Sequence, residues 1–126
     1  MKLSTRLAPQ NSLLLIMDHA FGEVPESMGG NLVAFTNSCV ALGTLAQHDG
    51  ETTVMLADAL DEDARGEIVF DGVLETPSRE LSVCDVTDAK LLTLDVAWLR
   101  TRVQVFANDL REPDEIVVVA SSVVEG

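Results

Sequence analysis

The chain has 126 residues, 47% of them hydrophobic, a size and composition that suit one folded domain and exclude a disordered protein. Its formal net charge of −13 excludes a protein that holds DNA, RNA or anionic lipid through a basic surface. No apolar run reaches the roughly 20 residues that span a bilayer, so we expect a single cytoplasmic domain, residues 1–126, without membrane contact.

The first predicted element is a short apolar strand, "SLLLIMD", from Ser12 to Asp18. The residues before it are expected to form a polar leader. Asp18 and His19 interrupt the apolar run, so no signal peptide is expected. The next stretch, "FGEVPESMGGN", is rich in Gly and Pro and predicts a loop.

Residues 32–46 fit both a helix and a strand. Their apolar residues recur at helical spacing, whereas their β-branched residues favour strands. We favour two strands between Val33 and Leu60 that fold as a hairpin at Asp49-Gly50, a dipeptide typical of hairpin turns. In that interpretation Cys39 is a small buried side chain. In the other, which stays open, Cys39 begins a helix.

Beyond Gly50, short strands alternate with charged or Pro-containing turns. The predicted strands are "ETTVMLA", "EIVFDGVLE", "ELSVCDV", "KLLTLDV", "RTRVQVFAND" and "IVVVASSVV", and "LDEDARGE" is a predicted turn. Their alternation places Phe70, Leu94, Val103 and Val105 in the core. This spacing predicts an all-β fold, an antiparallel β-sandwich of about seven to nine strands, with room for one short helical turn around Trp98.

Two short motifs resemble part of the isochorismatase-like cysteine hydrolases. The strand end "LLLIMD" would supply Asp18 as the catalytic aspartate, and "TNSCV" would supply Cys39 as the nucleophile. This resemblance implies a hydrolase. The chain departs from the family in two respects. Only 20 residues separate Asp18 from Cys39, and none of them is the lysine that the family requires. This segment is also too short for the intervening strands and helices of an α/β sheet. The hydrolase is therefore kept as an alternative, and no catalytic residue is expected.

No residue cluster predicts a metal ion or a cofactor. The spacing typical of metal ligands is absent from the four His and Cys residues, which are His19, His48, Cys39 and Cys84. The acidic segment "DALDEDARGE" lacks the order of carboxylates and the central Gly of a calcium-binding loop. We expect both cysteines to be buried free thiols.

The C-terminal half resembles small bacterial β-sandwich proteins of the competence nuclease inhibitor and immunity type. The pattern is "EIVFDGVLETPSRELSVCDV" followed by "TRVQVFANDLREPDEIVVVAS", and the resemblance covers about residues 30–122. It implies a non-enzymatic binding module that inhibits a protein partner. It also implies a contact surface of charged and polar residues, namely Arg100, Arg102, Asn108, Asp109, Arg111, Glu112 and Asp114.

The distribution of charge favours a basic protein as this partner. Residues 51–126 hold 17 acids and six bases, whereas residues 1–50 hold four acids and two bases. An acidic surface speeds association with a basic protein and opposes binding of nucleic acid. A carrier of a small apolar ligand is a third class of function, because sandwiches can hold ligands between their layers. The oligomeric state is left open.

Overall fold

The protein folds into two open β-sheets. A computed structural model describes residues 1–59 and 66–123 of the chain. These residues form ten strands in two five-stranded sheets, with two single-turn 3-10 segments, η1 (Gln10–Ser12) and η2 (Gln47–Asp49). The predicted all-β class is confirmed, although the strands outnumber the expected seven to nine. Among the described helical segments, none has the length and apolarity to cross a membrane.

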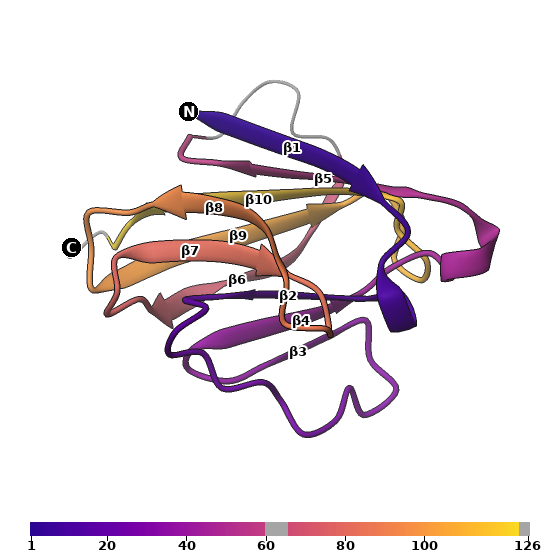
Figure 1. Ribbon diagram of the computed structural model, residues 1–126, viewed down its shortest axis with the longest axis horizontal. Helices are drawn as coiled ribbons and strands as arrows, with labels where there is room; N and C mark the ends of the chain where they lie inside the picture. The colour runs from indigo at the N-terminus through magenta and orange to yellow at the C-terminus, as the bar shows by residue number, and fades with distance from the viewer. Residues whose placement is uncertain (60–65, 124–126) are drawn as a thin grey trace.

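Sheet A has the strand order β1-β5-β10-β9-β6 (Figure 1). Its strands are β1 (Lys2–Leu7), β5 (Thr52–Ala57), β10 (Glu115–Ser122), β9 (Arg100–Ala107) and β6 (Glu67–Glu75). The expected polar leader is wrong, because Lys2–Leu7 pairs with β5 and half-buries every second residue. The expected antiparallel pairing is wrong at one place, since β10 runs parallel to β5.

Sheet B has the order β3-β4-β2-β7-β8, with antiparallel neighbours throughout. Its strands are β3 (Val33–Phe35), β4 (Cys39–Gly43), β2 (Leu13–Met17), β7 (Glu80–Cys84) and β8 (Lys90–Asp95). The strand interpretation of residues 32–46 is confirmed. The hairpin at Asp49-Gly50 is wrong, because β4 and β5 belong to different sheets and the segment between them crosses from one to the other.

One hydrophobic core joins the two sheets. Buried side chains of sheet B, such as Ile16 and Leu42, belong to the same cluster as Val54 and Leu56 of sheet A. In Figure 1, β7 and β8 of sheet B lie in front of β9 and β10 of sheet A. Apolar side chains from both sheets therefore share one core, which is where the alternation of apolar and polar residues places them.

The expected core residues lie inside with one exception. Leu94, Val103 and Val105 are buried, as predicted, whereas Phe70 is only partly buried. β6 is an edge strand, and its pairing with β9 shifts register between Ile68 and Phe70. Alternation in the sequence shows neither the edge position nor the shift. The expected helical turn around Trp98 is not formed, and the charged turn "LDEDARGE" lies largely outside the described residues.

A second, smaller cluster covers the outer face of sheet B. It consists of Leu15, Met17, Cys39, Ala41 and Cys84, with Leu13 and Met28 packed against it. The loop after β2 approaches so closely that a Cβ on Gly22 would lie 2.6 Å from the Met17 side chain. Because both faces of β2 are buried, its sequence is continuously apolar rather than alternating.

Candidate protein-binding surface

The two cysteines are buried free thiols in the smaller cluster. Burial, reinforced by the neighbouring Cys84, raises the pKa of Cys39 from 9.0 to about 12. Burial, with the nearby Asp88 and Asp85, raises the pKa of Cys84 to about 12 as well. A thiol is a nucleophile only as the thiolate. Cys39 therefore lacks the activation that a cysteine hydrolase requires, and this agrees with the expectation of a buried side chain.

Asp18 lies at the end of β2, close to Cys39 in sheet B, but its carboxylate is committed to backbone groups. The side chain is 1% exposed. Its Oδ1 accepts the N–H of Ala20 at 3.1 Å, and its Oδ2 accepts the N–H of Ser78 at 2.7 Å. Asp18 therefore ties the loop after β2 to the turn between β6 and β7, which is a structural role rather than that of a base.

The predicted contact residues from Asn108 to Asp114 come together in the loop between β9 and β10. Asn108 organises this loop, because its Oδ1 accepts the N–H groups of Asp114 and Glu115 at 3.1 Å each. Its Nδ2 donates to Asp114 Oδ1 at 2.7 Å. Asp109 Oδ1 accepts the N–H groups of Arg111 and Glu112, which lowers the pKa of Asp109. Apart from the buried Pro113 the loop is exposed, and its side chains hydrogen-bond to its own backbone.

Arg102 lies elsewhere. It sits within β9 on the outer face of sheet A and forms a bidentate pair with Asp71 of β6, at 3.1 and 2.8 Å. This pairing lowers the pKa of Asp71. Arg102 and Asn108 are six positions apart along β9 and its end, roughly 20 Å. The predicted contact set is thus divided between the loop and the opposite half of β9.

Arg100 belongs to a surface that sequence reasoning missed. Two adjoining hollows share Glu75 and Arg100, which are partners in the β6–β9 ladder. One, of about 240 Å³, is also lined by Phe21, Pro77 and Leu99, and the other, of about 300 Å³, by Asn37 and Val73. We call these seven residues the Glu75 surface. The end of β6 and the start of β9, which carry Glu75 and Arg100, lie at the left-hand end of the molecule in Figure 1, and the β9–β10 loop lies at the right-hand end.

Thr76 positions several parts of this surface. Its buried hydroxyl donates to the Trp98 carbonyl at 2.8 Å and shares a hydrogen bond with the Thr101 hydroxyl. Its N–H donates to the Leu99 carbonyl at 2.8 Å. These bonds hold Leu99 and the start of β9 beside the end of β6. The turn signal "TPSR" marked this position in the sequence, but not the residues that gather around it.

The Glu75 surface combines exposed apolar side chains with one acidic and one basic residue, Glu75 and Arg100. Phe21 is 48% exposed and Leu99 is 57% exposed. Large apolar groups grouped at the surface and interspersed with polar ones are typical of protein-binding sites. Both hollows are partly open to solvent and have room for a side chain of a partner.

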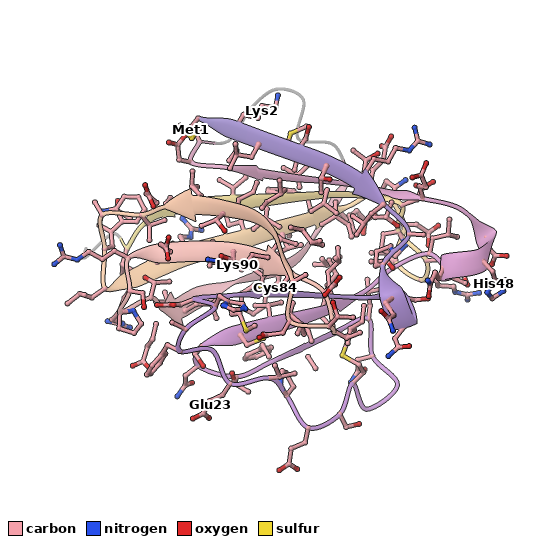
Figure 2. The ribbon with its side chains drawn as sticks, viewed as in Figure 1. Met1, Lys2, Glu23, His48, Cys84 and Lys90 are labelled. Carbon is pink, nitrogen blue, oxygen red and sulfur yellow. The ribbon has the colours of Figure 1, made fainter. Side chains whose placement is uncertain are left out.

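Neither histidine is among the residues that line this surface. His19 contacts Asp88, through the carbonyl at 2.9 Å and Oδ1 at 3.0 Å. His48 is strongly exposed on η2, at the right-hand end of the molecule in Figure 2. Within residues 1–59 and 66–123, no three His, Cys, Asp or Glu side chains are grouped closely enough to hold a metal ion.

Two solved structures share this fold. The crystal structure of ComJ from Bacillus subtilis, an inhibitor of the DNA-degrading activity of NucA, matches over 96% of both chains, with a TM-score of 0.69 and 10% identity. The protein named crocagin biosynthetic gene J matches over 95% of this chain and 94% of its own, with a TM-score of 0.53 and 10% identity. The resemblance to a competence nuclease inhibitor is confirmed at the level of fold. No protein-family model matches the chain, and no curated protein matches its sequence.

Proposed function

We propose that this protein is a non-enzymatic binding module of the inhibitor type, which holds a basic protein partner. The observation that carries the proposal is a fold shared along 96% of both chains with an inhibitor of a DNA-degrading activity. In this proposal residues 1–126 form one β-sandwich domain whose two sheets serve as a rigid frame for contact surfaces.

The surface chemistry supports a protein partner. The Glu75 surface offers apolar side chains beside an acidic and a basic residue, and the β9–β10 loop offers a second exposed segment with its own internal hydrogen bonds. The net charge of −13 favours a basic partner, because opposite net charges speed the encounter. A basic nuclease, which must itself attract DNA phosphates, has the complementary charge.

The alternatives have weaker support. A cysteine hydrolase needs an accessible thiolate, whereas Cys39 is buried and its pKa is raised to about 12. A carrier between the sheets needs an apolar cavity, whereas large side chains such as Leu14, Ile16 and Leu56 fill that space.

The proposal is tested by isolating the partner and measuring inhibition. The tagged protein is used to capture proteins from the source cell, and any DNA-degrading protein recovered is purified and assayed on plasmid DNA. Stoichiometric loss of DNA cleavage is the expected result. The association rate should fall with added salt as the Debye length drops below about 10 Å, while the dissociation rate changes less.

Two results would contradict the proposal. One is full cleavage activity of every recovered nuclease at saturating inhibitor. The other is tight binding of DNA by this protein itself at physiological salt. A variant in which the exposed Glu26 is replaced by Gln serves as the control for non-specific charge effects, because Glu26 lies in the loop before β3, outside both contact surfaces.

A further inference from the structure

The outer edge of β6 presents backbone groups without a partner strand. β6 ends sheet A and pairs on one side only, with β9. It is nine residues long, and the register is regular from Phe70 to Glu75. In an antiparallel ladder, successive residues direct their N–H and C=O groups alternately toward the partner strand and away from it.

Two hydrogen bonds fix this alternation. The N–H of Thr76 donates to the Leu99 carbonyl, on the β9 side. The N–H of Glu75 donates at 3.0 Å to the Asn37 carbonyl, on the opposite side. Counting back by two from Glu75, the backbone groups of Val73 and Asp71 also point away from β9. In the described part of the chain, no other backbone group bonds to them.

The outward N–H of Glu75 already has a hydrogen-bond acceptor from another segment. This acceptor is the Asn37 carbonyl, in the turn between β3 and β4, and it is the one backbone carbonyl of that turn that bonds to β6 among the described residues. Asp71 and Val73 are exposed residues, and in the described part of the chain no backbone group outside β9 bonds to these next two outward positions. The hollow lined by Val73, Glu75 and Asn37 lies beside these positions and has room for a side chain of such a strand.

Phe35 offers an apolar contact to the same strand. It is 64% exposed at the edge of sheet B, and its ring lies 5.2 Å from the ring of Phe70, centroid to centroid. Phe70 points from β6 into the space between the sheets, where it packs on the core. A strand added beside β6 would place its inward side chains against Phe35.

The acidic residues of β6 favour a basic strand as its added neighbour. Glu67, Asp71 and Glu75 are its charged residues, and it contains no Lys or Arg. Asp71 is paired with Arg102 on the sheet face, which leaves Glu67 and Glu75 to act on an added strand. Antiparallel pairing with a second copy, centred on Asp71, would set the two Asp71 residues opposite each other and bring the acids of both strands to the same edge. Like charges directly opposite each other are destabilising.

We propose that the outer edge of β6, at Asp71 and Val73, binds an extended, basic strand of the partner protein as a sixth strand of sheet A. Strand addition draws affinity from main-chain hydrogen bonds and specificity from alternate side chains. The proposal rests on the proposed function, because it names the segment through which the module holds its partner.

The first test uses a synthetic peptide that alternates lysine with valine. Amide hydrogen exchange, followed by NMR, is measured with and without the peptide. The amides of Asp71 and Val73 should exchange at least about tenfold more slowly with peptide bound, because they become hydrogen-bonded. The amide of Leu74, which already faces β9, is the internal reference. A peptide with glutamate in place of lysine should bind at least about tenfold more weakly.

The second test removes backbone hydrogen-bond donors, either from β6 of this protein or from the peptide. Val73→Pro deletes the outward N–H, and proline is tolerated at an edge position whose N–H faces solvent. Val73→Ala is its matched control, because it shortens the side chain but keeps the N–H. Val73→Pro should weaken peptide binding by about tenfold and Val73→Ala by much less. If Val73→Pro does not fold, the lysine peptide with N-methylated alternate amides gives the same comparison on the wild-type protein.

The results separate this proposal from the proposed function. Absence of peptide binding, protection outside β6, or equal binding of the N-methylated peptide overturns the edge site. If a captured nuclease is inhibited equally by the wild type and Val73→Pro, the inhibitor function stands and the edge site falls. If the peptide protects Asp71 and Val73 but no nuclease is inhibited, the edge site stands and the inhibitor function falls.

Discussion

The carboxylate of Asp18 accepts the backbone N–H of Ser78 at 2.7 Å, across 60 residues of chain. Its other oxygen accepts the N–H of Ala20. One buried side chain thereby fastens the loop that follows β2 to the turn that precedes β7. A residue that resembled a catalytic aspartate in the sequence is an anchor in the structure.

Replacing this anchor should destabilise the fold. Asp18→Ala leaves two part-buried backbone N–H groups without their acceptor, and we expect a loss of about 2–5 kcal/mol in the free energy of unfolding. Urea denaturation provides the measurement. Asp85→Ala is the matched control, because Asp85 accepts the N–H groups of Thr87 and Ala89 but is more exposed. An Asp18→Ala loss no larger than the Asp85→Ala loss would contradict the anchoring role.

The buried thiols predict a loss of stability at alkaline pH. Because the folded-state pKa values of Cys39 and Cys84 are raised from 9.0 to about 12, the unfolded chain ionises first. This contribution to stability is fully present below about pH 9 and is lost as the pH rises toward about 12. The chain contains no tyrosine that would titrate in the same range. Urea denaturation between pH 7 and pH 10.5, under a reducing agent, should show the decline.

The control for this prediction is the variant with both cysteines replaced by Ala. It should be less stable at pH 7, because two core atoms are lost, but its stability should vary less with pH. In the wild type at pH 7, a thiol reagent should label both cysteines slowly and label the urea-unfolded chain rapidly. Fast labelling of Cys39 in the folded protein would show that the thiol is accessible.

Phe70 should contribute less to stability than a fully buried ring. Since it is only partly buried, Phe70→Ala should cost about 1–3 kcal/mol, compared with about 3–5 for a ring enclosed in the core. Its contact with Phe35 should appear as a coupling of about 0.5–1.5 kcal/mol in a double-mutant cycle. Leu74→Ala, at a fully buried position of the same strand, is the reference for a core loss. A coupling near zero would mean that the two rings do not stabilise each other.

The two contact surfaces should respond differently to charge reversal. Glu75→Lys, within the Glu75 surface, should both slow association with a basic partner and speed dissociation. Glu112→Lys, in the β9–β10 loop, should mainly slow association, as expected of a residue at the rim. Each rate should change by about two- to tenfold, as measured by surface plasmon resonance. Glu26→Lys changes the net charge equally but lies in neither surface, so an equal effect there would show that only total charge matters.

Local sequence patterns predicted most of the strands, but they missed or misplaced others. Alternation identified β9 and β10 because one face of each is buried and the residue type reports that burial directly. It failed at β1, where Leu3, Thr5 and Leu7 are only half-buried and the intervening residues are polar. It also failed to show that β4 and β5 lie in different sheets, since both sheets bury their apolar faces in one core.

The candidate site was predicted only where it is local in sequence. Asn108 to Asp114 form one loop, and the side chains that shape it come from within the loop itself. The Glu75 surface joins Phe21, Asn37 and Leu99, which follow three different strands. Such a surface depends on which ends of the strands meet, and that is a property of topology.

The sequence by itself determined the all-β class, the acidic charge and the burial of Cys39, because residue type alone sets strand preference, ionisation and the cost of leaving water. The tertiary structure alone decided that β10 runs parallel to β5 and that β6 stands at an edge. It also decided that the Asp18 carboxylate holds a turn 60 residues away. These features depend on pairings between distant segments, and a side chain's own chemistry does not specify which distant backbone group it will meet.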